Sequence, residues 1–266
     1  MARSPKNAAE DDEAQSMVEL QAMLTDENAA EIVQSLSAAE MDTPFGMEGI
    51  RHWMHTDPVQ ASNWIAARPD ATQNQIGAVA QGWSADGVGL QNYAAQLPDT
   101  PWKQSFLTEA ISQFSARDPA VAVHLAQQMA PGNDQTSLLQ SVACNWVASD
   151  PNAALDWISG VNDPSLREKL VVSAAQAYAI TDPALASAWL ASMVKSDELL
   201  QNAALNIAQT WAAKDPAAAS WASQFPEGNT KTAAQNIVVN YWQQTDPAAA
   251  SAWLQNLSGS FVPQSH

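Results

Sequence analysis

Cysteine and long apolar runs are scarce in this sequence. The single cysteine, Cys144, excludes an intrachain disulfide and a cysteine-based metal site. No run of about 18 apolar residues occurs, so the sequence predicts no membrane-spanning helix. The N-terminal stretch lacks the apolar core of a signal peptide. We therefore expect a cytoplasmic protein if Met1 is the native start, and a periplasmic one if a leader was removed.

Positive charge is also scarce, because 11 Lys and Arg stand against 28 Asp and Glu, for a net charge of −17. An electrostatic field of that sign repels phosphate backbones and anionic lipid, which disfavours nucleic-acid and membrane-surface roles. The same field attracts a basic or neutral protein partner. Hydrophobic residues make up 46% of the chain, which is enough to fill a core.

The sequence does contain an internal repeat. The stretch WVASDPNAALDW at 146–157 places an Asp-Pro step between two tryptophans, and variants recur at 53–64, 83–93, 114–125, 178–189, 211–221 and 242–253. With a degenerate first copy, the repeat aspartates are Asp26, Asp57, Asp86, Asp118, Asp150, Asp182, Asp215 and Asp246. Their spacing of 29 to 33 residues indicates a helical-repeat protein.

The Asp-Pro step predicts a tight turn between two helices. Asp is a preferred N-cap residue, worth about 1 kcal/mol, because its carboxylate accepts from free N–H groups of the first helical turn. Pro is favoured at the next position, and it pushes the residue before it out of the α region. Further helix starts are predicted at Asp70, Thr100 and Asp163, and Ser37 with Glu40 predicts a capping box.

Apolar residues keep fixed distances from the repeat aspartates. An aromatic lies four residues before the Asp at Trp53, Phe114, Trp146, Tyr178, Trp211 and Trp242. An alanine lies four residues after it at Ala61, Ala122, Ala154, Ala186, Ala219 and Ala250. A large side chain facing a small one is typical of packed helix pairs. The second-helix tryptophans Trp157, Trp189, Trp221 and Trp253 are 32 residues apart, which predicts a seam between repeats.

These patterns predict an all-α fold, a right-handed α-solenoid of about eight helical hairpins of roughly 32 residues each. Residues 14–258 are expected to form a single helical-repeat domain. Residues 1–13 are small, polar and acidic and predict a disordered tail, and residues 259–266 a C-terminal tail.

The repeat resembles the tetratricopeptide class of helix-turn-helix repeats. That class places an aromatic late in its first helix, then a small residue and an aromatic in its second, as Tyr178, Ala186 and Trp189 do here. The resemblance covers roughly residues 14–258. Because the period is near 32 where the class has 34, and the turn is a shorter, rigid Asp-Pro, we describe the repeats as tetratricopeptide-like. Trp-rich Asp-Pro repeats of this kind also resemble those of uncharacterised bacterial proteins.

The resemblance implies that the first helices line a concave face that binds peptides or protein segments. The position two residues before the first-helix aromatic would face that groove. It holds Arg51, Gln81, Ser112, Cys144, Gln176, Gln209 and Asn240, all polar or small. A row of amides suits hydrogen bonding to an extended backbone, and we take Arg51, Gln81, Gln176, Gln209 and Asn240 as the candidate peptide-binding face. The alternative is that they form only the solvent side of amphipathic helices.

The C-terminal end is a second candidate surface. Repeat arrays expose the apolar face of their last repeat unless it is capped. Here the last repeat offers Trp253, Leu254 and Leu257, with Phe261 close behind. Either Phe261 folds back over this end, or the end docks onto another chain, which makes self-association or assembly into a larger complex a hypothesis.

Other chemically versatile residues have simpler explanations. His52 and His55 lie three apart on one helix, but no third metal ligand follows at suitable spacing. Cys144 has no basic neighbour to activate its thiol. Asp156 and Glu168 fit solvated surface positions, and His124 a boundary position. Trp102 lies off the repeat pattern beside Lys103 and is the best candidate for an exposed aromatic, unless it packs under the preceding loop.

The sequence therefore predicts a non-catalytic protein-interaction module or scaffold subunit, without a cofactor or metal. Its partner would be a protein or peptide, with a basic one favoured by the charge of −17, or further copies of the chain. A closed α/α toroid enzyme acting on a glycan or an isoprenoid is one alternative, which requires carboxylates outside the cap positions to converge on one cavity. A purely structural spacer in a larger complex is the other.

Overall fold

The computed structural model describes residues 23–195, 197–212, 217–223 and 228–259, without the side chains of residues 197, 217, 219, 230 and 256–259. All regular structure in these ranges is helical, which confirms the all-α class. The chain divides into two compact units, 1–138 and 139–266, and the division falls inside one long helix. The single-domain expectation for 14–258 stays a prediction. The tail at 1–13 and residues 260–266 lie outside the described residues.

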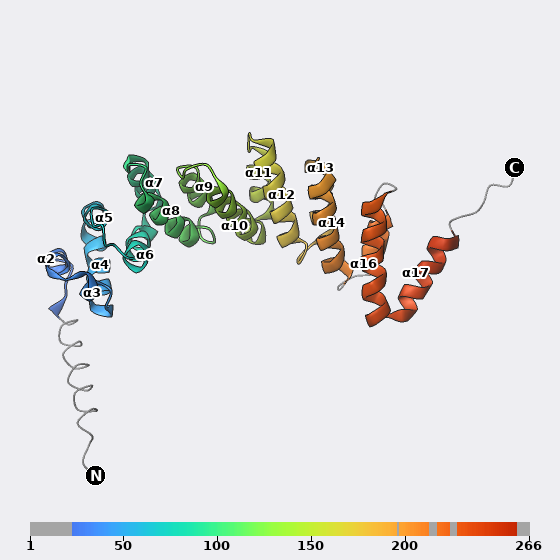
Figure 1. Ribbon diagram of the computed structural model, residues 1–266, viewed down its shortest axis with the longest axis horizontal. Helices are drawn as coiled ribbons and strands as arrows, with labels where there is room; N and C mark the ends of the chain where they lie inside the picture. The colour runs from blue at the N-terminus through green and yellow to red at the C-terminus, as the bar shows by residue number, and fades with distance from the viewer. Residues whose placement is uncertain (1–22, 196, 213–216, 224–227, 260–266) are drawn as a thin grey trace, which may run out of the picture. The chain divides into compact units, whose positions relative to one another are not determined.

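Figure 1 labels the helices. Unit 1 contains α2 (Ala29–Ser35), α3 (Ala38–Met41), α4 (Pro44–Thr56), α5 (Pro58–Ala66), α6 (Gln73–Gly82), the 3₁₀ turn η1 (Trp83–Ala85), α7 (Gly87–Gln96), α8 (Pro101–Phe114) and α9 (Pro119–Ala126). The division between the units lies in α10 (Asn133–Ser149). Unit 2 contains α11 (Pro151–Ser159), α12 (Pro164–Tyr178), α13 (Pro183–Met193), α14 (Asp197–Ala212), α15 (Ala217–Ser223), α16 (Asn229–Thr245) and α17 (Pro247–Gly259).

The predicted Asp-Pro turn is confirmed. The Asp57 carboxylate accepts from the backbone N–H of Gln60 at 2.8 Å, while the N–H of Asp57 donates to the carbonyl of Trp53 at 2.9 Å. The same two bonds recur at the later described repeat aspartates Asp118, Asp150, Asp182 and Asp246. Asp57, Asp150 and Asp246 are each the only residue between two helices, so one residue ends the first and caps the second.

Two repeat aspartates differ from this pattern, and Asp215 lies outside the described residues. Asp86 caps α7 through the N–H of Gly89, but its own N–H reaches Trp83, three residues back, because α6 ends in the 3₁₀ turn. The prediction that Asp26 caps a helix, like the other repeat aspartates, is wrong. The N-cap of α2 is Asn28, without a side-chain cap, and the Asp26 carboxylate binds the His52 imidazole instead.

Most helix starts outside the Asp-Pro turns also follow the sequence. Ser37 and Glu40 form the predicted capping box, and Thr100 and Asp163 cap α8 and α12. The prediction for Asp70 is wrong: Thr72 caps α6 through the N–H of Gln75. The Asp70 carboxylate pairs with Arg68 at 2.9 Å, which leaves the cap to the hydroxyl two residues later.

Aromatic pairs join the two helices in most of the described hairpins. Ring centroids lie 4.8 to 5.9 Å apart in the pairs Trp53–Trp64, Trp83–Tyr93, Trp146–Trp157, Tyr178–Trp189, Trp211–Trp221 and Trp242–Trp253. Aromatic pairs at such distances add to the stabilisation that burial provides. The aromatic contacts of the second-helix tryptophans are thus made inside hairpins. The predicted seam between repeats stays a prediction.

The predicted small residues lie where the helices approach most closely. Ala61, Ala122, Ala154 and Ala186 are fully buried, Ala250 is nearly so, and the side chain of Ala219 is outside the described residues. Gly82 is a further close approach, since a Cβ there would lie 2.5 Å from the side chain of Met54. Small residues at these points bring the helix backbones together.

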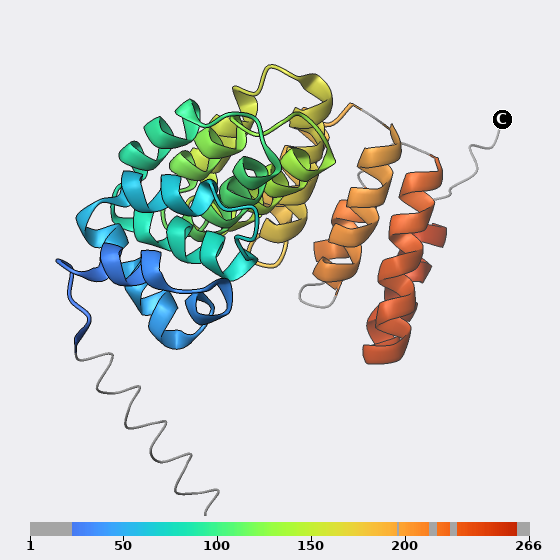
Figure 2. The same cartoon turned by 60° about the vertical axis from the view of Figure 1, so that its left-hand side comes forward.

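Within each unit the longer first helices of the hairpins contact one another in chain order. In unit 1, α4 packs on α2 and on α6, and α6 packs on α8 (Figure 1). In unit 2, α14 packs on α12 and on α16, and α14 and α16 stand side by side in Figure 2 as well. The shorter helices α5, α7 and α9 lie on one side of the first row and contact it or each other.

Candidate binding groove

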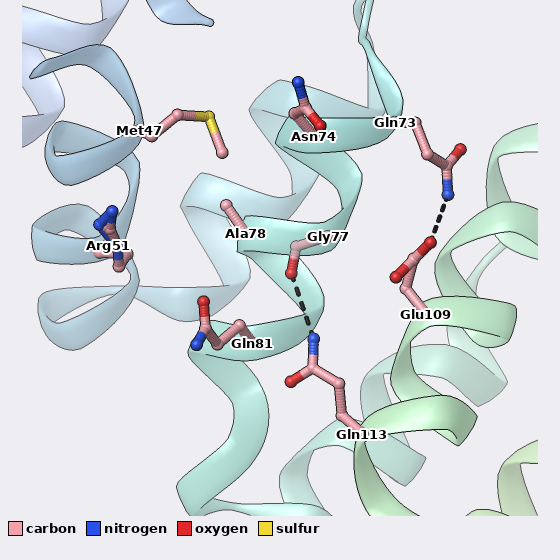
Figure 3. Close-up of a pocket in the computed structure, with 9 residues that line it drawn as sticks. All are labelled: Met47, Arg51, Gln73, Asn74, Gly77, Ala78, Gln81, Glu109 and Gln113. Carbon is pink, nitrogen blue, oxygen red and sulfur yellow. Dashed lines mark hydrogen bonds between the residues drawn. The ribbon is translucent and has the colours of Figure 1, made fainter. Parts of the chain in front are cut away.

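Two of the residues predicted to share a binding face line one groove in unit 1. Arg51 of α4 and Gln81 of α6 stand on either side of a groove of about 430 Å³ that crosses α4, α6 and α8 (Figure 3). Its remaining lining residues are Met47, Gln73, Asn74, Gly77, Ala78, Glu109 and Gln113. We call this the first groove. It lies on the first helices of three successive hairpins.

Two side-chain amides bridge α6 and α8 along one flank of the first groove. Gln73 Nε2 donates to Glu109 Oε1 at 2.6 Å, and Gln113 Nε2 donates to the carbonyl oxygen of Gly77 at 3.4 Å (Figure 3). These bonds fix the positions of Gln73 and Glu109 before any ligand arrives. This flank is therefore preorganised, which lowers the entropic cost of binding.

The flank between α4 and α6 has unpaired amides. Gln81 and Asn74 are exposed and have no hydrogen-bond partner among the residues that the structure describes. Figure 3 shows Gln81 extending from α6 toward α4. Arg51 forms an ion pair with Glu48 of its own helix, so its positive charge is already balanced. This flank offers neutral donors and acceptors rather than net charge.

Gly77 shapes the wall of the first groove. It lies inside α6, where glycine is intrinsically less favourable than alanine by roughly 0.5–1 kcal/mol. A Cβ at this position would meet only Glu109 Oε2, at 3.8 Å, which is ordinary contact. No packing reason in the described structure therefore requires glycine here. The absence of a side chain at Gly77 leaves the backbone of α6 exposed to the groove between Glu109 and Gln113.

A second groove, of about 750 Å³, adjoins the first and shares Gln73 with it. Its other lining residues are Gln104, Ser105 and Thr108 of α8, and the segment Met129, Ala130, Pro131, Gly132, Asn133, Asp134, Ser137 and Leu138, which leads into α10. We call this the second groove. Met129 is buried and Leu138 is half-buried, so this groove has a larger apolar part than the first, whose apolar side chains are those of Met47 and Ala78.

The other predicted groove residues line neither of these grooves. Gln209 and Asn240 are exposed and Gln176 is half-buried, and all three belong to unit 2. Ser112 is exposed on α8 but lines neither groove. Cys144 is half-buried, its Sγ lies 3.4 Å from the carbonyl oxygen of Ser173, and burial raises the pKa of its thiol. Of the predicted set, Arg51 and Gln81 are the two that line the first groove.

The C-terminal docking end is described in part. Trp253 is half-buried and contacts the Trp242 ring edge-on, with centroids 5.9 Å apart, while Leu254 is 40% exposed. The side chain of Leu257 and all of Phe261 lie outside the described residues. Docking at this end therefore stays a prediction.

The remaining candidates have structural partners. His52 lies between Asp26 and Glu48, with Nε2 3.6 Å from Glu48 Oε1. Glu168 Oε1 accepts from the N–H of Lys195 at 3.0 Å, so it is not a free surface carboxylate. Trp102 is half-buried and stacks on Phe106, with ring centroids 4.9 Å apart, so of the two alternatives for this residue exposure is the one that is wrong.

Two searches of the described residues bear on the class of site. They contain no group of three or more His, Cys, Asp or Glu side chains placed to hold a metal ion. Among the helices within that same part of the chain, none is long and apolar enough to cross a membrane. Comparison of the chain with protein-family models, with curated proteins and with solved structures gives no match.

Proposed function

We propose that this protein is a non-catalytic interaction module, a right-handed solenoid of tetratricopeptide-like hairpins that binds an extended segment of another protein. The observation that carries the proposal is the first groove, where Arg51 and Gln81 lie on one polar surface with residues of three consecutive first helices. That is the location that the resemblance to tetratricopeptide repeats implies for a ligand.

The unpaired amides supply a chemical reason for an extended segment. A side-chain amide has both a carbonyl acceptor and an NH₂ donor. An extended backbone presents both an N–H and a C=O at every residue, and each needs a partner when it leaves water. Gln81 and Asn74 match that requirement without specifying a side chain. The ligand is therefore recognised through its main chain in this part of the groove.

The use made of the repeat carboxylates also supports binding over catalysis. Asp57, Asp86, Asp118, Asp150 and Asp182 each accept a backbone N–H at a helix start. A carboxylate that caps a helix is held at the turn, away from the face formed by the first helices. The toroid enzyme needs carboxylates gathered in one cavity, and these residues serve another purpose.

Site-specific photocrosslinking tests the proposal. The crosslinker p-benzoylphenylalanine is placed at Gln81 or Asn74 in the groove, and at the exposed Gln60 of α5 as a control outside it. In cells that contain the natural partners, we expect a discrete protein adduct from the two groove positions and none from Gln60. The additional substitution Gly77→Leu places a large side chain in the groove and should abolish the adduct. Equal labelling from all three positions would sink the proposal and favour a spacer.

A further inference from the structure

The two grooves differ in chemistry although they adjoin, and that difference defines the ligand. The first groove holds Glu109, and the second holds Asp134. Neither carboxylate has a cationic partner among the residues that the structure describes, whereas Arg51 is balanced by Glu48. The combined surface is therefore negative, as the chain is at −17. A complementary ligand carries positive charge.

Glu109 is placed to bind a basic side chain. Its Oε1 is fixed by Gln73 Nε2, and its Oε2 lies over the position beside Gly77, where a Cβ would be only 3.8 Å away. The absent side chain at Gly77 keeps this oxygen open to the groove. A carboxylate held by one hydrogen bond, with its second oxygen free, is a suitable acceptor for an arginine or lysine.

The second groove supplies an apolar contact. Met129 is 5% exposed and forms a buried surface there, with the half-buried Leu138 and the exposed Pro131 beside it. The polar side chains of Gln104, Ser105 and Thr108 line the α8 side. An aliphatic side chain of the ligand placed against Leu138 and Pro131 would remove apolar surface from water on both partners.

The spacing of the two contacts follows from helix packing. The first groove lies on the α6 side of α8 and the second lies against the segment 129–138, so the two contacts are separated by about the width of one helix, about 10 Å. An extended chain rises about 3.3 Å per residue, so the two contacts are about three residues apart. We propose that the grooves form one tract for an extended segment with Arg or Lys about three residues from a large aliphatic side chain. This inference rests on the proposed function, because it names the ligand of the same groove.

Selection from a phage-displayed library of random peptides against the intact protein provides the probe. We expect selected peptides to share a basic residue and a Leu, Ile or Met about three positions apart. For a synthetic peptide of that consensus, Glu109→Gln should weaken binding about tenfold, since it removes a charge-assisted hydrogen bond but keeps a partner for Gln73. The matched control Asp156→Asn removes the same charge from an exposed position outside both grooves and should change the Kd less than twofold.

The apolar contact is tested on α10. Ser137 is exposed and lines the second groove, so Ser137→Phe should fill the groove and abolish binding, while Ser141→Phe, one turn further along the same helix, should not. Replacing the peptide's basic residue by Gln should give no further loss in Glu109→Gln, because the pair is already broken. Thermal unfolding of each variant confirms that it is folded.

The outcomes separate the two proposals. If the selected peptides bind Gly77→Leu, Glu109→Gln and Ser137→Phe as tightly as the wild type, both the groove and this ligand are overturned. Peptides that are blocked by Gly77→Leu, yet are acidic or are unaffected by Glu109→Gln and Ser137→Phe, would overturn the ligand and leave the groove standing. The predicted consensus with both sensitivities supports both.

Discussion

Asp26 binds His52, whereas Asp150, at the equivalent place in a later repeat, binds the backbone N–H of Ala153 at 3.0 Å. The same residue type at the same repeat position thus forms a side-chain pair in one repeat and a helix cap in another. The difference arises because α2 begins at Ala29, after a turn whose N–H groups are served by Asn28 and the backbone. The Asp26 carboxylate is left to reach α4.

The two aspartates should respond differently to truncation. Asp150→Ala removes a helix cap, so we expect a loss of about 1 kcal/mol in the free energy of unfolding. Asp26→Ala removes an exposed pair with His52 and should change that free energy by less than about 0.5 kcal/mol. Urea unfolding followed by circular dichroism measures both. Peptide binding should persist in folded Asp150→Ala, and equal losses for the two variants would contradict the cap assignment.

Gly77 and Gly82 form a second contrast within α6. Gly77→Ala should raise the free energy of unfolding by roughly 0.5–1 kcal/mol, because the new Cβ meets nothing closer than 3.8 Å and alanine favours the helix. Gly82→Ala should lower it by about 1–3 kcal/mol, because its Cβ would lie 2.5 Å from Met54. Chemical denaturation of both variants checks the signs. A loss of stability in Gly77→Ala would show that the groove wall is not open.

Asp42 and Gln75 should be coupled. Asp42 Oδ1 accepts from Thr72 Oγ1 at 2.6 Å and from Gln75 Nε2 at 3.0 Å, and Gln75 is fully buried with its Oε1 unpaired. Asp42→Ala leaves the buried amide of Gln75 without this acceptor and should lower the free energy of unfolding by about 1–3 kcal/mol. Adding Gln75→Met should recover part of that loss, because it removes the stranded group. A double-mutant cycle by urea unfolding measures the coupling, and strictly additive effects would argue against it.

The buried phenol of Tyr93 should make the stability of the fold sensitive to alkaline pH. Burial raises the pKa of its phenol from 10.0 to about 12, against a smaller lowering by a hydrogen bond with Ser62. Between these values the unfolded chain loses the proton and the folded chain keeps it. The contribution of Tyr93 to stability is therefore complete below pH 10 and declines as pH rises toward about 12.

The variant Tyr93→Phe isolates this effect. It loses the bond from Tyr93 Oη to Asn63 Oδ1, 3.1 Å long, so it starts with a lower Tm at neutral pH. Because it cannot ionise at this position, its Tm should fall less steeply than that of the wild type above pH 10. Calorimetry across that range measures the two slopes, and parallel curves would refute the assignment.

The sequence was most informative where one residue type has one local role. Asp57 and Asp118 cap helices as predicted, because a cap depends on neighbours within four residues. Asp70 was misassigned since Thr72, two residues on, competes for the same helix start. Asp26 was misassigned since its partner, His52, is 26 residues away.

The groove could be predicted only in part. Arg51 and Gln81 were found because one repeat position was followed along the chain. Gln73, Asn74 and Glu109 were missed because the groove also takes residues one and two helical turns before the repeat position, where no single residue type recurs. Gln113 was missed because it directly follows the repeat position Ser112 of α8. Gly77, a glycine inside a helix without a packing requirement, was the available indication.

The one-residue turns at Asp57, Asp150 and Asp246 leave no linker residue that could accommodate an insertion between the helices they join. An extra residue there would displace the cap from the N–H group that it serves and rotate the second helix out of its aromatic pairing. The connection from Ala67 to Thr72 has several residues to absorb such a change. Natural length variation and engineered insertions should therefore be accepted between hairpins and rejected within them, so that the chain grows or shrinks by whole hairpins.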